Sequence, residues 1–487
     1  MLQYVNRRLP RVLRARRHLH VCVVGSGPAG FYTTKYLLKE HSLAKHGPLS
    51  VNIVESLPTP YGLVRSGVAP DHQEVKAVVN DFAAVAEDPR VQFLGNVEVG
   101  KDVNLDELME CYHMVVLAYG AAGDRALNIP GAESNGVISA RAFVGWYNGH
   151  PSARVLTRPI SEALSSHDTV VVVGVGNVAL DCARILVKSQ GHELQGTDIS
   201  DEALAVMKES GVKRVVVLGR RGHVQAAFTI KELRELLNLG CVVHPEELKL
   251  GKTEASLKEL AQLRPKKRMD ALLSKHTGGP DDDSIQQASV SSELRFLASP
   301  IEILAQDGHV VGVKVERNTL EGEPFTQKAI GTGNMEVIDC GLVIASVGYK
   351  GHPVDGLPFH ETKGIALNEH GRVIGKPGLY CAGWLKRGPS GIIGTNIVDA
   401  KGTVSSIVED VESGAMDSLD LPKDGMKGLL HKLEYKKKTD VVDWQGAKRI
   451  ETEEARLGGL AGKVKLKLSK VEELLQAAAS GNEPTAQ

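Results

Sequence analysis

The sequence lacks closely spaced cysteines. Its six cysteines stand singly along the 487 residues: Cys22, Cys111, Cys182, Cys241, Cys340 and Cys381. Local zinc sites and redox-active disulfides need pairs such as C-x-x-C, so we expect no metal site and no cysteine relay. Several of these cysteines lie in apolar runs such as HVCVVG and GLYCAG, where a free thiol behaves as a small hydrophobic side chain. We predict inert core thiols in a reducing compartment.

The sequence also lacks a long apolar run. No uninterrupted apolar stretch approaches the roughly 20 residues that a membrane-spanning helix needs, so we expect any membrane contact to be peripheral. Hydrophobic residues make up 42% of the chain and the formal net charge is −1, which favours a soluble protein. A chain of 487 residues is too long for one compact core, so we expect two or more domains with room to bury a cofactor.

Residues 1–20 lack acidic side chains and contain six arginines: Arg7, Arg8, Arg11, Arg14, Arg16 and Arg17. Without these arginines the chain has 52 basic and 59 acidic residues, a net charge of −7. An arginine-rich, acid-free segment before the first strand is typical of a mitochondrial presequence. A solvated basic terminus is the alternative. We predict a leader at 1–20 and a matrix location, with any membrane association peripheral to the inner membrane.

A first glycine motif follows a short apolar strand predicted at 21–24. Gly25, Gly27 and Gly30 fit G-x-G-x-x-G, and a helix is predicted to follow. The three glycines permit a tight turn, the approach of backbone amides to a pyrophosphate, and close packing of helix on strand. Glu55 ends the next predicted strand, where a carboxylate can bind the ribose hydroxyls of an adenosine. An ordinary acid at a strand end is the alternative for Glu55.

A second unit of the same kind lies at 169–187, with Gly174, Val175, Gly176, Asn177 and Val178 leading to alanine in place of the third glycine. Its next strand, at 214–219, runs into Arg220 and Arg221 where the first unit has an acid. Two guanidinium groups can hold a ribose 2′-phosphate by charge-assisted hydrogen bonds. The motif therefore favours NADPH over NADH, and a solvated arginine pair is the alternative.

The two units are separated by about 150 residues, the typical size of a domain. The predicted fold class is α/β, with two three-layer, Rossmann-like dinucleotide-binding domains. Apolar strands at 114–118 and 342–347 are expected to carry the chain between the domains, so the first domain is discontinuous. The last residues, 477–487, read as a frayed tail.

Eight strings then resemble the adrenodoxin reductase family, the NADPH-dependent ferredoxin reductases among the glutathione reductase-like flavoproteins: GSGPAGFYT, YGLVRSGVAPDH, GNVEVGKDV, ARAFVGWYNG, GNVALD, GRRG, AFTIKELRE and CAGWLKRGPSGII. The resemblance runs from Val21 to about Trp444. It implies FAD and NADPH as cofactors. The implied domains are an FAD-binding domain at 21–122 and 349–487, with a C-terminal extension, and an NADPH-binding domain at 123–348.

The resemblance also implies site residues. FAD contacts would come from Gly25, Gly27, Ala29, Gly30, Glu55, Leu63, Val99, Trp384, Gly391, Ile392 and Ile393. NADPH contacts would come from Gly174, Val175, Gly176, Asn177, Val178, Arg220, Arg221, Glu232 and Gly391. Val175 departs from the family, because the animal enzymes usually have glutamine there, so a side-chain role at this position is in doubt. Trp384 stands where many relatives have aspartate, and it can cover the flavin or nicotinamide ring and exclude water. A buried core tryptophan is the alternative.

NADPH delivers two electrons as a hydride, whereas an iron-sulfur protein accepts one, so a flavin is needed between them. Because no cysteine relay exists, we expect electrons to leave the flavin directly for a docked protein. In the family, His72 and Asp181 lie near the flavin, and we consider them a polar pair that forms a proton path. A structural hydrogen bond between domains is the alternative.

The expected acceptor is an acidic [2Fe-2S] ferredoxin that supplies haem mono-oxygenases, iron-sulfur cluster assembly or both. Basic residues for its docking are Arg234, Arg264, Lys266, Lys267 and Arg268, and such a patch steers an acidic partner. A solvated charged face is the alternative. We expect a monomer that binds no nucleic acid.

Two other functions remain open. An NADPH-linked subunit of a larger synthase would usually carry clustered cysteines, which this chain lacks. A flavoprotein that binds nucleotide without turnover is the second, and it would not be bleached by NADPH.

Overall fold

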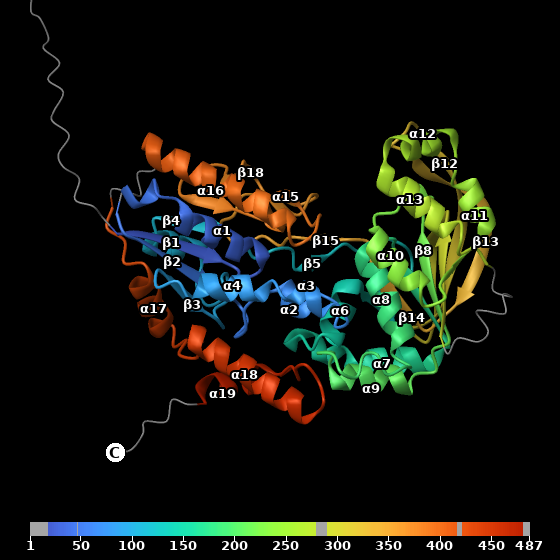
Figure 1. Ribbon diagram of the computed structural model, residues 1–487, viewed down its shortest axis with the longest axis horizontal. Coiled ribbons are helices and arrows are strands. Elements are labelled where there is room, and N and C mark those ends of the chain that lie inside the picture. Colours follow the sequence, from blue (N-terminus) through green and yellow to red (C-terminus); the bar gives the residue numbers. More distant parts are fainter. Residues whose placement is uncertain (1–17, 46, 279–289, 416–420, 481–487) are drawn as a thin grey trace, which may run out of the picture.

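The computed structural model describes residues 18–45, 47–278, 290–415 and 421–480. It forms two lobes connected at their centre (Figure 1). Most of the predicted leader, 1–20, lies outside the described residues. The first strand begins at Leu19, two residues before the predicted start, because Leu19 pairs with Leu49 of the neighbouring strand.

The first lobe is built on a seven-stranded sheet in the order β18-β19-β20-β4-β1-β2-β3. The strands from β20 to β3 are parallel, and β18 and β19 form an antiparallel edge. The strand bounds are β1 Leu19–Val24, β2 Leu49–Val54, β3 Val91–Leu94, β4 Met114–Leu117, β18 Asn368–Glu369, β19 Arg372–Val373 and β20 Leu379–Cys381.

Both faces of this sheet are covered, which is why its central strands are continuously apolar. Val21 and Val23 pack with α1 and α16, whereas Cys22 and Val24 pack with α5 and α17 on the other face. The helices of this lobe are α1 Pro28–Lys39, α2 Leu63–Ser66, α3 Gln73–Lys76, α4 Val79–Ala86, α5 Leu105–Cys111, α15 Trp384–Arg387, α16 Thr395–Ser413 and α17 Met426–Tyr435. A small hairpin joins β16 Phe359–His360 to β17 Ile365–Ala366.

The second lobe has three layers. Its central sheet has the order β6-β14-β7-β8-β10-β9, with all pairs parallel. Val170 and Val172 face the helices, and Val171 and Val173 face a three-stranded antiparallel sheet. The strand bounds are β6 Val137–Ser139, β7 Thr169–Val173, β8 Arg214–Gly219, β9 Val242–Val243, β10 Ser291–Phe296, β14 Leu342–Ala345, and, in the antiparallel sheet, β11 Ala298–Gln306, β12 His309–Glu321 and β13 Lys328–Asp339.

The helices of the second lobe are α6 Ala140–Tyr147, α7 Thr157–Ser166, α8 Asn177–Lys188, α9 Asp201–Glu209, α10 Ile230–Leu237, α11 Pro245–Leu250, α12 Glu254–Gln262 and α13 Arg264–Leu273. The chain enters this lobe through β5 Gly123–Asp124 and leaves it through β15 Tyr349–Lys350. These two short strands pair antiparallel with each other and lie between the lobes (Figure 1). The two crossings therefore form one connection.

The C-terminal helices pack beneath the first lobe (Figure 1). They are α18 Trp444–Leu460 and α19 Val471–Ala479. Trp444 makes edge contacts with the rings of Tyr61 and Phe93. The expected tail at 477–487 is wrong for its first three residues, because α19 includes them and Ala477 and Ala478 are buried in the core of the first lobe. Among the helices of the described ranges, none is both long and apolar enough to cross a bilayer.

Arg184 of α8 connects the two lobes. Its side chain is fully buried and binds both carboxylate oxygens of Asp71, each at 2.9 Å, across the interface. It also binds Asp181 of its own helix at 2.7 Å, and Lys188 adds a second cation to Asp71 at 2.8 Å. Burial opposes ionisation of Asp71, but the hydrogen bonds and charges of Arg184 and Lys188 outweigh it and hold the Asp71 pKa below its ordinary value.

Replacing Arg184 by methionine should destabilise the folded state by about 3–5 kcal/mol, the cost of leaving buried carboxylates without their partner. The change is measured as the difference between wild type and variant in the urea concentration at which half of the protein is unfolded. Arg158→Met is the matched control, because Arg158 is exposed and, among the residues that the structure describes, pairs only with Glu162 of the same helix.

The difference between wild type and Arg184→Met should also depend on pH. A carboxylate whose folded pKa is lowered contributes stability above its unfolded pKa, near 3.9, and this contribution is lost as pH falls through the folded pKa. The gap between the two midpoints should therefore narrow in acid, beginning below about pH 5. A gap that stays constant from pH 7.5 to pH 4 would show that Asp71 is not the group stabilised by Arg184.

Candidate active site

The turn between β1 and α1 leaves space in front of the helix N-terminus. Gly25 has a φ of +102°, and a Cβ added there would lie 2.7 Å from the carbonyl oxygen of Ala118. A Cβ at Gly30 would lie 1.9 Å from the carbonyl oxygen of Gly25. A Cβ at Gly27, in contrast, would meet no atom within 4 Å. Two glycines are thus required by packing, and the third keeps the approach to the α1 amides open for a pyrophosphate.

Glu55 is fixed beside this turn. Its Oε2 accepts hydrogen bonds from the backbone N–H of Ser26 at 2.9 Å and from the Ser26 hydroxyl at 2.6 Å. Its Oε1 accepts from the N–H of Leu57 at 3.2 Å and from the Ser56 hydroxyl at 3.0 Å. These four donors fill the acceptor sites of the carboxylate, so a ribose hydroxyl would take the place of the Ser56 hydroxyl, which can rotate away. The carboxylate is therefore held at the glycine turn in a position that suits a ribose, rather than extended into solvent as an ordinary acid at a strand end would be.

The loop that begins at Gly383 lies against the first motif. Gly383 has a φ of +71°, and a Cβ there would lie 2.5 Å from the Cβ of Ala29. Trp384 follows, half-buried, with its Nε1 donating to the Ser390 carbonyl at 3.2 Å and its ring 5.7 Å from that of Tyr349. A core tryptophan would be fully buried, so this partial exposure favours the role of lining the cofactor.

Two apolar side chains among the predicted FAD residues are exposed, Leu63 at 40% and Ile392 at 66%. Exposed apolar surface of this kind fits a site that a bound ring covers. Ile393 packs partly buried against the core of the first lobe, as does Val99, and Gly391 is exposed with a φ of +83°. These residues fit FAD, because they combine an open glycine turn, a held carboxylate and an apolar surface.

The glycine turn between β7 and α8, which we call the second cradle, has the same geometry as the turn between β1 and α1, the first cradle. Gly174 has a φ of +130°, and a Cβ there would lie 2.2 Å from the carbonyl oxygen of Ser346, whereas a Cβ at Gly176 would meet no atom within 4 Å. Ala179 replaces the third glycine and is fully buried. The Val175 side chain packs beside Gly219 of β8. The Val175 side chain therefore serves packing, and only its backbone groups are left to contact NADPH. This agrees with the sequence-based doubt about a binding role for its side chain.

Asn177 and Glu232 meet at the start of α10. Asn177 Oδ1 accepts the backbone N–H of Thr229 at 2.8 Å, and the Thr229 hydroxyl donates to the Glu232 carboxylate. Val178 packs partly buried against the core of the second lobe. The N-termini of α8 and α10 are thereby joined. Sequence spacing does not reveal Thr229, which is the residue that connects the two predicted contacts.

Arg220 and Arg221 follow β8. The Arg220 carbonyl accepts from Asn318 Nδ2 at 2.8 Å and the Arg221 carbonyl accepts from the N–H of Leu297. Their side chains are exposed and half-buried, respectively. Within the described part of the chain, neither guanidinium has a carboxylate within ion-pair distance. A fixed backbone with two uncommitted guanidinium groups fits a phosphate.

The expected direct pair of His72 and Asp181 does not form. His72 Nε2 lies 2.6 Å from the Glu235 carboxylate of α10, and Asp181 is taken by Arg184. Burial raises the Asp181 pKa, and the Arg184 charge opposes this. His72 therefore makes an interdomain contact, as the structural alternative expects. A proton path through these residues stays a prediction.

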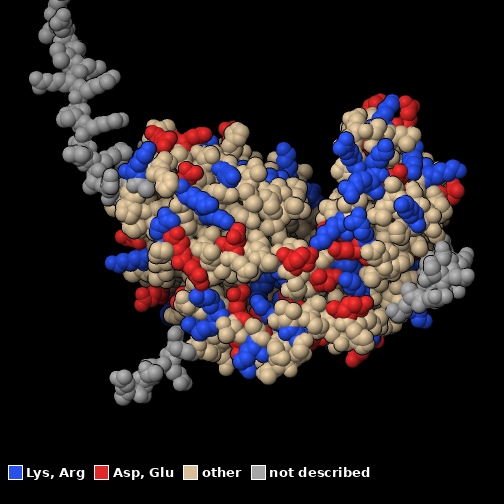
Figure 2. Space-filling view, in the orientation of Figure 1, with Lys and Arg blue, Asp and Glu red and all other residues tan. Residues whose placement is uncertain are grey.

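The predicted docking residues lie on two neighbouring helices. Arg234 is exposed on α10, and Arg264, Lys267 and Arg268 are exposed on α13, which packs against α10. Figure 2 shows basic side chains gathered over this part of the second lobe. Lys266 is different, because it donates to the Ala226 carbonyl. Burial lowers the pKa of Lys266, Glu259 opposes this, and the charge of Arg221 lowers it further, so Lys266 is committed to Ala226 near Arg221 and is not part of the exposed patch.

Comparison with known proteins agrees with this geometry. A family model described as pyridine nucleotide-disulphide oxidoreductase matches residues 19–238. The mitochondrial NADPH:adrenodoxin oxidoreductase of Arabidopsis thaliana is 45% identical over 478 residues, which cover 95% of this chain and 96% of that protein. This chain belongs to the NADPH:adrenodoxin oxidoreductase family. The Homo sapiens mitochondrial member is also 45% identical, over 94% of this chain and 91% of its own length.

A solved structure, Mycobacterium tuberculosis FprA in complex with NADPH, has a TM-score of 0.86 at 38% identity and covers 95% of this chain and 100% of its own. Membership of the adrenodoxin oxidoreductase family confirms the predicted resemblance and the α/β fold. It also confirms the predicted enzyme class, an oxidoreductase with FAD and NADPH as cofactors.

Gly176→Ala should weaken NADPH binding without harming the fold. The added methyl group meets no protein atom but occupies the space that a pyrophosphate needs. We expect the Kd for NADPH to rise about tenfold or more, which is about 1.4 kcal/mol, and the thermal midpoint to stay unchanged. Gly211→Ala is the control, because its Cβ also meets no atom within 4 Å but lies outside the cradle. Unchanged NADPH affinity in Gly176→Ala would place the pyrophosphate elsewhere.

Proposed function

We propose that this enzyme takes hydride from NADPH through bound FAD and passes electrons one at a time to an acidic [2Fe-2S] ferredoxin of the mitochondrial matrix. The observation that carries the proposal is the pair of glycine cradles, one in each lobe, joined at a single connection by β5 and β15. The ferredoxin would then supply haem mono-oxygenases, iron-sulfur cluster assembly or both. We propose the domain division 21–122, 123–348 and 349–487 for these roles.

The residues of each cradle have separate tasks. The amides at the start of α1 would hold the FAD pyrophosphate across Gly27, and Glu55 would accept hydrogen bonds from the ribose hydroxyls. Trp384 and Ile392 would cover the ring system and exclude water. The amides at the start of α8 would hold the NADPH pyrophosphate across Gly176. Bound FAD supplies a ring that accepts a hydride and returns electrons singly.

Hydride transfer requires the two lobes to keep a fixed distance. The contacts of Arg184 with Asp71 and of His72 with Glu235 cross between them. Buried, charge-assisted bonds of this kind have strict geometry, so they limit how far one cradle can move relative to the other. We therefore assign these residues a positioning role, in which they hold the two lobes at a fixed distance from each other.

Electrons must leave the flavin without a cysteine relay. All six cysteines are free and buried, and burial raises the pKa of Cys241 and of Cys381 to about 12. Thiols in that state are inert as nucleophiles. This supports direct transfer to a docked partner, and the exposed arginines and lysine on α10 and α13 support an acidic one.

The arginine pair gives a test of the electron donor. Arg220→Gln and Arg221→Gln each remove one charge-assisted contact to the 2′-phosphate, worth about 1.5–3 kcal/mol. We expect the KM for NADPH to rise by about ten- to a hundredfold in each variant, whereas the KM for NADH should change little, because NADH has no 2′-phosphate. Equal effects on both coenzymes would mean that the pair does not read the phosphate.

Charge reversal at Arg268 tests the partner. Arg268→Glu should raise the KM for a [2Fe-2S] ferredoxin about tenfold and leave NADPH-dependent reduction of a small dye unchanged. The effect should shrink as ionic strength rises. Arg158→Glu is the control, since Arg158 is exposed on α7, away from the patch. Parallel loss of dye and ferredoxin activity would contradict a docking role.

A further inference from the structure

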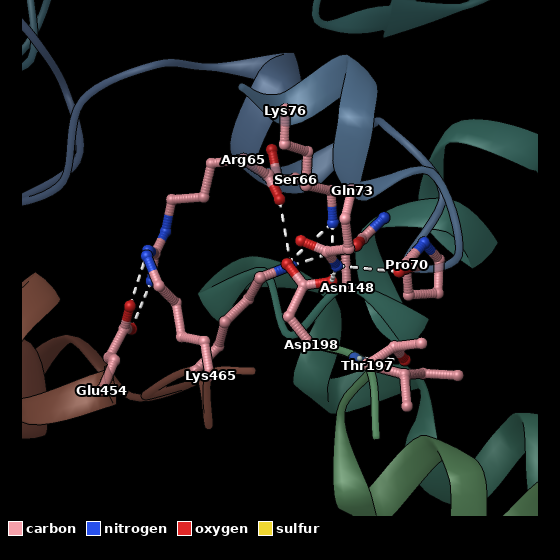
Figure 3. A network of polar contacts seen from close by, with 12 residues as sticks. Arg65, Ser66, Pro70, Gln73, Lys76, Asn148, Thr197, Asp198, Glu454 and Lys465 are labelled. Atoms are coloured by element: carbon pink, nitrogen blue, oxygen red, sulfur yellow. Dashed lines mark hydrogen bonds and ion pairs between the residues drawn. The ribbon is translucent and has the colours of Figure 1, made fainter. Parts of the chain in front are cut away.

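A cavity of about 220 Å³ lies where three segments meet. Its walls come from α2 and α3 of the first lobe, from the loop before α9 of the second lobe, and from the C-terminal segment around α18. None of the residues assigned above to FAD, NADPH or the ferredoxin lines it. Figure 3 shows the polar contacts at this junction. The volume accommodates several waters or a small ion.

The cavity wall carries an excess of positive charge. Four of its residues are basic, Arg65, Lys76, Lys465 and Lys467, and two are acidic, Asp198 and Glu451. Arg65 is neutralised from outside the cavity, because Glu454 of α18 binds its guanidinium with both carboxylate oxygens. When Lys467 is protonated, the three remaining cations face two carboxylates, and one positive charge is in excess.

Asp198 accepts three donors at once. Lys76 Nζ lies 2.6 Å from its Oδ1 and 2.7 Å from its Oδ2, Lys467 Nζ lies 3.0 Å from Oδ2, and Gln73 Nε2 lies 2.8 Å from Oδ1. Figure 3 shows Gln73 and Lys76 beside the aspartate. One carboxylate therefore serves two ammonium groups and an amide, and it cannot satisfy every proton they offer.

Unused donors remain on two of the lysines. Lys467 also donates to the Arg65 carbonyl at 3.0 Å and to Asn148 Oδ1 at 3.1 Å, so its three protons have acceptors. Lys76, within the described residues, contacts Asp198 alone. Lys465 lies 3.7 Å from Glu451, beyond hydrogen-bond distance. Lys76 and Lys465 thus have protons available for an acceptor inside the cavity.

This excess charge is partly shielded from water. The side chains of Lys467 and Lys76 are 3% and 11% exposed, and that of Lys465 is 26% exposed. Burial, and then the charge of Lys76, lower the pKa of Lys467 to about 7, although Asp198 opposes the shift. Burial also lowers the pKa of Lys76. Cations crowded in a site of low polarity are stabilised when an anion joins them.

We propose that this cavity binds one small oxyanion, sulfate or inorganic phosphate, held by hydrogen bonds from Lys76 and Lys465 and by the positive charge of Lys467. Because Lys76 belongs to the first lobe and Lys465 and Lys467 to the C-terminal segment, a bound oxyanion ties these two segments together beside the second lobe. A ligand that binds only the folded protein raises its stability. The oxyanion is therefore a structural ligand of the lobe junction, and its binding does not depend on the proposed electron transfer.

The test is calorimetric titration of sulfate into the FAD-loaded enzyme with saturating NADP⁺, at ionic strength held constant with chloride. FAD and NADP⁺ fill the phosphate sites of both cradles. We expect saturable binding at one site. Lys465→Gln should weaken it about tenfold, the effect of losing one charge-assisted contact. Lys470→Gln is the matched control, because this lysine of the same segment pairs with Glu473 at the surface.

Proton uptake gives a second readout that does not depend on any variant. The groups that face Lys467 are Arg65, Lys76, Lys465, Asp198 and Glu451. A bound anion raises the pKa of Lys467, so binding at pH 8 should take up protons, measured from the heats in buffers of different ionisation enthalpy. Sulfate is the suitable probe, because phosphate itself titrates near neutral pH. The absence of saturable binding, or equal affinity in wild type, Lys465→Gln and Lys470→Gln, would overturn the proposal.

Discussion

The relative position of the two cradles depends on the burial of Arg184. A guanidinium without water must be matched by carboxylates in fixed geometry, and Arg184 takes one from each lobe, Asp71 and Asp181. The connection consists of the paired strands β5 and β15, which have only two residues each. It cannot by itself fix the orientation of one lobe relative to the other. The charged contacts across the interface supply that constraint on the two lobes.

The same glycine arrangement occurs in both lobes, and each glycine has a distinct physical reason. Gly25 and Gly174 have positive φ angles and lie against backbone carbonyls, where no side chain fits. Gly27 and Gly176 have ordinary backbone angles and open surroundings. The protein's own packing therefore does not require glycine at the latter two positions. A ligand that approaches the helix amides closely would require glycine there, and the position of both glycines at a helix N-terminus supports two bound dinucleotides.

Local sequence patterns were sufficient to predict individual strands and the turns that end them. The strand at 214–219 agrees with β8, because apolar runs ended by turn residues carry that information. The antiparallel sheet β11–β13 could not be predicted, since its long strands are partly exposed and mix polar with apolar residues. The partner of His72 could not be predicted either. Glu235 lies 163 positions away, and only the closure of the interface brings the two together.

Lys266 shows how sequence position alone can misplace a charge. It lies in the basic run RPKKR, between Pro265 and Lys267. Its side chain, however, donates to the Ala226 carbonyl and lies near Arg221. The basic side chains of α13 therefore point in two different directions. Arg264, Lys267 and Arg268 face solvent, and Lys266 adds its field to the arginine pair. A 2′-phosphate and an acidic partner would therefore act on neighbouring parts of one positive cluster. Lys266 therefore connects, within α13, the region proposed for the donor with the region proposed for the acceptor.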